Sequence, residues 1–226
     1  MDGVEYACSG STVGGAVPSV VVTAAHCVSD GSGGWARNWT FVPGYANGRA
    51  PYGAYAAVTY YVAAAWVDGA NENDDIAFVV TRPLRARPPA GAAAASAAAA
   101  SAGGGPAGGG LPVGEMVGEQ PITFGPRGAA ASVFGYPAVK PYTGGQLDYC
   151  AGHLSPDPYG GADAGLPCAM TEGDSGGPWL SDFDARTGTG VITGVTSFKY
   201  SGQSRNLYSA NLGVVAQALY TRAERP

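Results

Sequence analysis

The most informative stretch of this chain is residues 172–178, which read Glu-Gly-Asp-Ser-Gly-Gly-Pro. Its serine, Ser175, is followed by two glycines and preceded, two positions earlier, by Gly173. Because glycine has no Cβ atom, the backbone amides of Gly173 and Ser175 can turn toward one point while the serine hydroxyl stays accessible. This arrangement suits acyl transfer to a serine nucleophile; the alternative is a glycine-rich turn with an inert serine.

A serine nucleophile needs a base, and the sequence contains two histidines, His26 and His153. His26 directly follows the apolar run at residues 20–25 and precedes Cys27, a position that would hold the ring in one orientation. His153 lies close to two prolines and is predicted to be a solvated loop residue. We therefore expect His26 to act as the base.

A buried carboxylate should orient that histidine, and Asp75 is the candidate because it leads into the apolar run 76–80. Its nearest rival is Asp74, and a carboxylate at the start of a strand is also common without any catalytic role. Residues 173–177 formally fit the Gly-x-Ser-x-Gly elbow of α/β-hydrolases. That class is disfavoured because its histidine must follow the serine, and no histidine follows Ser175.

The secondary-structure pattern is that of an all-β chain with a terminal helix. Short apolar or aromatic runs with turn residues between them predict strands at residues 17–24, 39–43, 58–66, 76–80, 131–136, 177–181 and 190–198. A helix is predicted only at the C-terminus, around Val214–Leu219. The most economical architecture is a barrel or a pair of barrels.

The chain is long enough for one domain or for two small halves that share a core. Residues 83–118 change character, with Arg-Pro repeats followed by alanine- and glycine-rich blocks, and cannot bury enough apolar surface to offset their ordering entropy. We interpret them as a flexible linker or insertion between halves at 1–82 and 119–226. An exposed alanine helix over residues 92–102 is the alternative.

Composition excludes several functions. The net charge of -5 and the 12 scattered basic residues provide no stripe for binding nucleic acid. No apolar run is long enough to span a bilayer. Four cysteines without a Cys-x-x-Cys pair favour disulfides over a zinc site and imply an oxidising compartment, although their pairing stays open at this level. The first residues contain no export signal, so we expect a processed or shortened start.

Three segments now point to a family. They are residues 22–27 (Val-Thr-Ala-Ala-His-Cys), residues 75–77 (Asp-Ile-Ala) and residues 173–178 (Gly-Asp-Ser-Gly-Gly-Pro), in the order histidine, aspartate, serine. Together they resemble the chymotrypsin-like (trypsin-like) serine peptidases, over nearly the whole chain apart from about residues 83–118. Residues 41–48 and 51–53 look like the bacterial glutamyl endopeptidase branch, whose members are secreted.

The resemblance implies two six-stranded antiparallel β-barrels, with the site in the cleft between them and a C-terminal α-helix. It gives the triad roles to His26, Asp75 and Ser175, and the oxyanion hole to the amides of Gly173 and Ser175. Ser197 matches a serine that supports the buried aspartate, on a strand that pairs with an extended substrate. The implied disulfides join Cys8 to Cys27, beside the histidine, and Cys150 to Cys168, near the specificity pocket.

The sequence departs from the family at the specificity pocket. Trypsin-like enzymes carry an aspartate where this chain has Ala169, so a preference for Arg or Lys is not expected. Glutamyl endopeptidases carry a histidine where this chain has Thr196. Lys199 and Thr171 are candidates for binding a carboxylate at the pocket rim; the alternative for Lys199 is a solvated surface lysine. The candidate substrate-binding residues are Ala169, Met170, Thr171, Thr196, Ser197, Phe198 and Lys199.

The start of the chain departs from the family as well. Family members begin with a further strand, and in animal enzymes a freed terminal amine pairs with the residue matched by Asp174. We expect this chain to lack the start of the mature protein, with one barrel edge exposed as a result. Arg127 is a candidate internal partner for Asp174.

These observations predict a secreted serine endopeptidase that works through an acyl-enzyme. Its partner is a polypeptide substrate bound as an extended strand, and no nucleic acid, membrane, metal or cofactor is implied. We expect a monomer. The alternatives are a non-catalytic binding module of the same fold, or a truncated chain in which the oxyanion hole does not form.

Overall fold

The structure of the protein, a computed structural model, describes residues 3–84, 110–203 and 205–225. Strands dominate, and the helices are short except for α3 at the C-terminus. In chain order the elements are β1 Ser11–Thr12, β2 Val20–Thr23, η1 Ala25–Cys27, β3 Thr40–Phe41, β4 Tyr55–Val62, α1 Ala64–Val67, η2 Glu72–Asp74, β5 Ala77–Thr81, α2 Val113–Val117, β6 Ala130–Gly135, β7 Asp148–His153, β8 Ser155–Pro156, β9 Ala164–Pro167, β10 Pro178–Asp184, β11 Thr189–Phe198, β12 Asn206–Asn211 and α3 Val214–Ala223.

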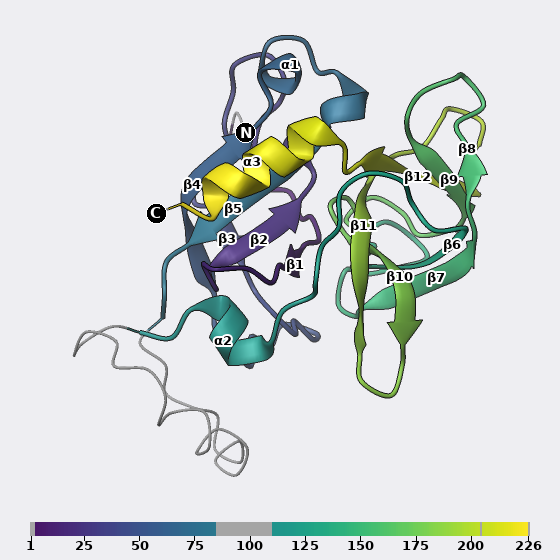
Figure 1. Cartoon of the computed structure of the whole chain (residues 1–226). Coiled ribbons are helices and arrows are strands. Elements are labelled where there is room, and N and C mark those ends of the chain that lie inside the picture. The colour runs from purple at the N-terminus through teal and green to yellow at the C-terminus, as the bar shows by residue number, and fades with distance from the viewer. Residues whose placement is uncertain (1–2, 85–109, 204, 226) are drawn as a thin grey trace.

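The strands form two curled antiparallel sheets that lie side by side (Figure 1). The N-terminal sheet has the order β1-β2-β5-β4-β3, and the C-terminal sheet has the order β7-β6-β10-β11-β12-β9-β8. This confirms the all-β, chymotrypsin-like class with a terminal helix. The strand counts differ from the six expected in each half. Among the described residues the N-terminal sheet has five strands, and the two-residue β8 contributes to the seven of the other.

Alternation of side chains explains why the apolar run at β2 forms a central strand. Val20 and Val22 point into the main core with Phe78, whereas Val21 points to the opposite face and packs with Tyr55. Successive side chains of a strand face opposite sides of the sheet, so a run that is buried on both faces must be apolar throughout.

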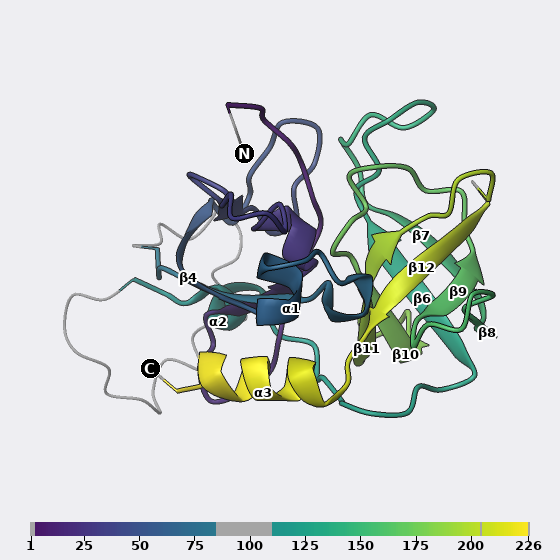
Figure 2. The same cartoon turned by 90° about the horizontal axis from the view of Figure 1, so that it is seen from above.

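The main core joins the two halves. It contains Phe78 from β5, Leu180 from β10, Ile192 from β11 and Leu219 from α3. Figures 1 and 2 show α3 lying across the N-terminal sheet, although it follows the last strand of the C-terminal sheet, and it packs against β4 and β5. The C-terminus therefore fastens one half to the other through buried apolar surface.

Some sequence-based assignments were wrong in detail. Trp66 was expected to end a strand but lies in α1, one turn of helix beyond β4. His153 was expected in a loop but is the last residue of β7, where it is solvent-exposed. The sequence pattern also does not predict β7, β9 and β12, nor the two-residue strands β1 and β8. Polar residues interrupt β7 and β12, and β9 contains a glycine and ends in a proline.

Part of the expected linker has regular structure. Within residues 83–118, α2 buries Val113 completely beside Val21 and Tyr55, and Leu84 pairs with Leu111. Residues 85–109, including the possible alanine helix at 92–102, lie outside the described residues. No helix in the described part of the chain is long and apolar enough to cross a membrane.

The edge strands β1 and β3 both border a groove of about 1760 Å³, which we call the edge groove. Residues 3–12 and 33–45 line it from the N-terminal half, and Phe134, Gly135 and Tyr136 line it from the other half. Its lining includes neither histidine, and it lacks Asp75 and Ser175. The edge groove is thus separate from His26, Asp75 and Ser175.

The shared core makes Phe78 a sensitive position. Phe78 is fully buried, and its ring lies 5.5 Å from that of Tyr220 on α3. We expect Phe78→Ala to lower the free energy of unfolding by about 3–5 kcal/mol, because the cavity can collapse only in part. Guanidinium denaturation with the disulfides intact measures this. The matched control is Val58→Ala on β4, where the side chain is 56% exposed and the expected change is within about 0.5 kcal/mol. Equal effects of the two changes would contradict the shared core.

Candidate active site

Asp75 and His26 are joined by two hydrogen bonds. The backbone amide of His26 donates to Asp75 Oδ1 at 2.8 Å, and the ring Nδ1 lies 2.7 Å from Asp75 Oδ2. His26 is part of η1, directly after β2, and Asp75 lies at the C-terminal end of η2, just before β5. Since β2 and β5 are paired neighbours, the sheet brings the two segments together. A carboxylate bound to Nδ1 leaves Nε2 free to accept a proton.

The second half of the chain supplies a third bond to the same carboxylate. Ser197 Oγ on β11 donates to Asp75 Oδ2 at 2.5 Å. Asp75 is only 2% exposed, and a buried carboxylate is costly unless it is paired and hydrogen-bonded. Asp74, the rival carboxylate, instead accepts a hydrogen bond from the exposed Asn71 side chain. Asp75, and not Asp74, is therefore the carboxylate bonded to His26.

The surroundings of His26 favour its protonated form. Burial lowers the pKa of His26, but the hydrogen bond and negative charge of Asp75, together with the charge of Asp174, outweigh burial and raise that pKa above its ordinary value. The ring of Trp66 lies 6.2 Å from the His26 ring, and its indole nitrogen donates to the Ser29 carbonyl. No sequence pattern indicated that Trp66 lies beside His26.

The loop containing Ser175 is built around glycines that cannot be replaced. Gly173 has φ +106°, and a Cβ atom there would lie 2.6 Å from the Tyr136 carbonyl oxygen. Gly176 has φ +80°, and a Cβ atom there would lie 2.5 Å from the Ser9 carbonyl oxygen. Both positions need the left-handed backbone and the close approach that only glycine allows. The loop can therefore press against the end of β2, just before His26.

Ser175 reaches the His26 segment through its backbone. Its carbonyl oxygen accepts a hydrogen bond from the Ser9 amide at 2.7 Å and lies 3.7 Å from Cys27 Sγ. The described contacts include no hydrogen bond between the Ser175 hydroxyl and the His26 ring. Such bonds are often long without substrate and tighten in the substrate complex. The structure thus gathers His26, Asp75 and Ser197 into one network and places Ser175 beside it.

Two disulfides frame the site. Cys8 is bonded to Cys27, next to His26, and Cys150 is bonded to Cys168, seven residues before Ser175 in the sequence. Both pairings are those that the resemblance implied. The first fixes the chain beside the histidine, and the second fixes the start of the segment that leads to the serine.

Arg127 is not the partner of Asp174. Its guanidinium donates to the side chain and carbonyl of Ser209 on β12, with Asp163 as the nearby opposite charge. Asp174 is 3% exposed, and its Oδ2 has no hydrogen-bond partner among the described residues. Burial raises the pKa of Asp174 to about 7, although the charge of Lys199 opposes that rise. The expectation failed because Arg127 and Asp174 belong to separate loops whose relative position no local pattern fixes.

The candidate pocket residues differ in how accessible they are. Ala169 is exposed, whereas Met170 is 1% exposed. Thr196 is also buried, and its hydroxyl accepts a hydrogen bond from the Trp179 indole at 3.0 Å. The Thr171 hydroxyl donates to the Val139 carbonyl.

Further along β11 and just beyond it, the Phe198 ring stacks on Tyr208, and Lys199 Nζ donates to the Cys168 carbonyl at 3.2 Å. The Thr196 hydroxyl is therefore buried against Trp179, whereas Ala169 is exposed and Lys199 is partly buried.

Known structures resemble this one over nearly the whole chain. The protease Anisep from Arthrobacter nicotinovorans is 34% identical with a TM-score of 0.84, and the match covers 99% of this chain and 91% of that one. The thermostable serine protease AL20 from an extremophilic microorganism is 33% identical with a TM-score of 0.81, over 97% and 90% of the two chains. A Glu endopeptidase shares the fold at 16% identity, with a TM-score of 0.70 over 99% and 89%.

No family model matches the sequence. One curated relative, an extracellular metalloprotease of Bacillus subtilis (strain 168), is 37% identical over 70 residues, which are 31% of this chain and 21% of that protein. Among the described residues, one group of three side chains could hold a metal ion: Cys8, His26 and Cys27. Because the two cysteines share a disulfide, neither is available as a thiolate, so this donor set does not fit a catalytic metal.

The buried Asp174 predicts an unusual pH dependence of stability. Its folded pKa of about 7 lies above the ordinary value of 3.8, so the folded state holds the proton more tightly and loses stability as the pH rises from about 3.8 to about 7, above which the loss levels off. We expect Asp174→Asn to gain stability relative to the parent protein as the pH rises from 5 to about 7, by at most about 1.4 kcal/mol per pH unit, and the difference to level off by pH 8. Urea denaturation across that range measures the difference.

The matched control is Asp182→Asn, at an exposed carboxylate on the neighbouring strand β10. Its stability difference from the parent protein gives the baseline for replacing a carboxylate by an amide at an exposed site. A constant difference for Asp174→Asn would show that Asp174 is ionised in the folded protein throughout this range.

Proposed function

The chain belongs to the chymotrypsin-like serine proteases and is a serine-type endopeptidase, and we propose that His26, Asp75 and Ser175 form its catalytic triad. The observation that carries this proposal is the set of bonds that places Asp75 between His26 and Ser197. A carboxylate held in this way fixes the tautomer of the imidazole and stabilises the imidazolium that forms during proton transfer.

Catalysis begins with Ser175. Its Oγ attacks the carbonyl carbon of the scissile peptide bond while His26 Nε2 takes the hydroxyl proton. The tetrahedral intermediate then collapses, the C–N bond breaks, and His26 returns the proton to the departing amine. Water then attacks the carbonyl carbon of the remaining ester while His26 takes its proton. The second tetrahedral intermediate collapses as the bond to Ser175 Oγ breaks, the proton returns from His26 to that oxygen, and the acid product is released. The raised pKa of His26 suits a group that must accept a proton and then donate it.

The amides of Gly173 and Ser175 stabilise the negative oxygen of each tetrahedral intermediate. Support comes from the Glu172 carbonyl, which accepts a hydrogen bond from the Ala138 amide at 2.7 Å. In a trans peptide the carbonyl and the following N–H point in opposite directions, so this bond turns the Gly173 amide away from Ala138. Donors fixed in advance have no reorganisation cost at the moment of reaction.

The substrate is a polypeptide bound as an extended strand beside residues 197–199, at and just beyond the end of β11. Ala169 provides no carboxylate for a basic side chain, so Arg and Lys are not preferred N-terminal to the cleaved bond. Lys199 is the candidate for binding an acidic side chain instead. Burial lowers the pKa of Lys199, while the charges of Asp174 and Glu172 oppose this shift.

We place the protein outside the cell. Two disulfides need an oxidising compartment to persist, and the matched Bacillus subtilis protein is named as extracellular.

Active-site labelling tests the triad. We expect a fluorophosphonate probe to form an Oγ–P bond with Ser175 of the oxidised protein, releasing fluoride. Ser175→Ala should abolish labelling, and Asp75→Asn should slow it by about 10³–10⁴-fold because the imidazole loses its orienting charge. Intact-mass spectrometry measures the adduct. Ser32→Ala, at an exposed serine 143 residues before Ser175 (175 − 32), is the control and should label like the parent protein.

The labelling rate should also fall as the pH is lowered through the raised pKa of His26, since only the neutral ring accepts a proton. Labelling that persists in Ser175→Ala would overturn the assignment of the nucleophile. A well-folded parent protein that does not label would favour a binding module or a chain without a formed oxyanion hole.

Cleavage-site mapping on a peptide library tests the pocket. We expect no enrichment of Arg or Lys immediately before the cleaved bond, because the exposed Ala169 offers no opposite charge. Ala169→Asp should raise the share of Arg and Lys at that position, and the library is read by mass spectrometry for both proteins. A parent protein that already selects Arg or Lys would refute this assignment of the pocket.

A further inference from the structure

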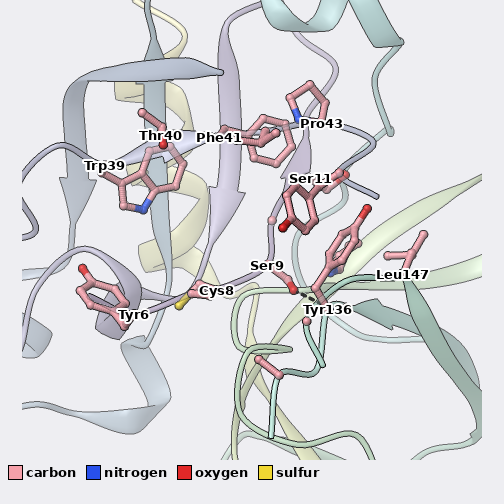
Figure 3. Close-up of a pocket in the computed structure, with 18 of the residues that line it drawn as sticks. Tyr6, Cys8, Ser9, Ser11, Trp39, Thr40, Phe41, Pro43, Tyr136 and Leu147 are labelled. Atoms are coloured by element: carbon pink, nitrogen blue, oxygen red, sulfur yellow. Dashed lines mark hydrogen bonds between the residues drawn. The ribbon is translucent and has the colours of Figure 1, made fainter. Parts of the chain in front are cut away.

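Ser9 connects the N-terminal half to the loop that contains Ser175 (the serine loop) through two hydrogen bonds. Its amide donates to the Ser175 carbonyl at 2.7 Å, and its hydroxyl donates to the Gly173 carbonyl at 2.8 Å. The same hydroxyl accepts from the Tyr136 amide at 2.8 Å, as Figure 3 shows, and the Ser9 carbonyl accepts from the Thr23 hydroxyl at 2.8 Å. Ser9 itself is 8% exposed.

These bonds hold the loop at both of the residues assigned to the oxyanion hole. Ser9 binds the carbonyl of Gly173 on one side of Asp174 and the carbonyl of Ser175 on the other. The peptide before Gly173 is held separately, by the bond from Ala138 to the Glu172 carbonyl. The peptide after Gly173 is held by the Ser9 hydroxyl.

Gly173 is the point at which this loop needs such support. Its φ of +106° lies in a region where glycine moves readily, so the backbone by itself does not fix the direction of the neighbouring amides. A hydroxyl suits this position because it can donate to one backbone group and accept from another at once. Alanine would leave the buried Gly173 carbonyl and the Tyr136 amide without this partner.

Resting on the oxyanion role proposed above, we propose that Ser9 is a positioning residue for catalysis, whose hydroxyl keeps the amides of Gly173 and Ser175 aimed at the developing oxyanion. Ser9 acts through the loop and does not touch the substrate. Its position directly after Cys8 strengthens this coupling, because Cys8 is bonded to Cys27 beside His26. One short segment thus anchors the base and the oxyanion donors together.

The experiment compares the oxidised parent protein with Ser9→Ala, Ser9→Val and Ser9→Thr. Valine and threonine have nearly the same shape and differ in the hydroxyl, so this pair makes the result independent of Ser9→Ala alone. The readouts are kcat and KM on a peptide amide, and the inhibition constants of a peptide boronate, which forms a tetrahedral adduct, and of a product peptide. Circular dichroism measures the folded fraction under the assay conditions.

Removing a whole oxyanion donor costs about 10²–10³-fold in rate, so loosening the loop should cost less. We expect Ser9→Ala and Ser9→Val to lower kcat by about 10–100-fold and to weaken boronate binding by a similar factor. KM and product binding should stay within about twofold, and Ser9→Thr should retain most of the activity. A transition-state effect of this kind lowers kcat without raising KM.

Thr12→Val is the matched control. The Thr12 hydroxyl is also buried at 8% exposure and also donates to a backbone carbonyl of a distant segment, that of Gly118, at 2.8 Å. Thr12→Val should lower the stability of the protein about as much as Ser9→Val does, and it should leave kcat unchanged. Normal kcat in Ser9→Ala and Ser9→Val, or equal losses in Thr12→Val, would overturn this role for Ser9 alone. A parent protein that fluorophosphonates do not label would overturn the proposed function and this inference with it.

Discussion

The buried carboxylate of Asp75 is the interaction on which the site depends. At 2% exposure it is stable only because three donors surround it: the amide and ring of His26 and the hydroxyl of Ser197. Two of these donors come from the N-terminal half and one from the C-terminal half, so the charge is satisfied only when the halves are docked. The two halves must therefore be packed correctly for Asp75 to orient the imidazole of His26.

A steric constraint complements this electrostatic one. Gly173 and Gly176 leave no room for a Cβ atom against Tyr136, Ser9 and the end of β2. Glycine there permits the serine loop to lie directly on the segment that leads to His26, and the Ser9 hydrogen bonds then remove the mobility that glycine introduces. Flexibility in the sequence is thus converted into a fixed geometry by contacts from the other half.

The burial of Asp174 in the serine loop lowers the stability of the folded protein when its carboxyl group is ionised. Asp174, the residue before Ser175, is buried with one carboxylate oxygen unpaired among the described residues, and burial raises its pKa to about 7. Groups with strongly displaced pKa values concentrate at functional sites, where strain and unsatisfied charge are tolerated. The positive charge of Lys199 opposes the rise in the pKa of Asp174. Lys199 is also the proposed partner of an acidic substrate side chain, so one lysine contributes to the electrostatics of both places.

The sequence by itself determined the motif residues, their order and the all-β class, because each depends on local features. The glycines around Ser175, the apolar runs before His26 and after Asp75, and the final helix can all be recognised within a few residues. Only the tertiary structure decided that Ser197 reaches Asp75, that Ser9 reaches Gly173 from 164 residues away, and that Arg127 turns to Ser209 instead of Asp174. It also decided that Trp66 enters a helix and that the N-terminal sheet has five strands among the described residues. Such contacts arise when two sheets pack together, and no local propensity encodes which distant groups then meet.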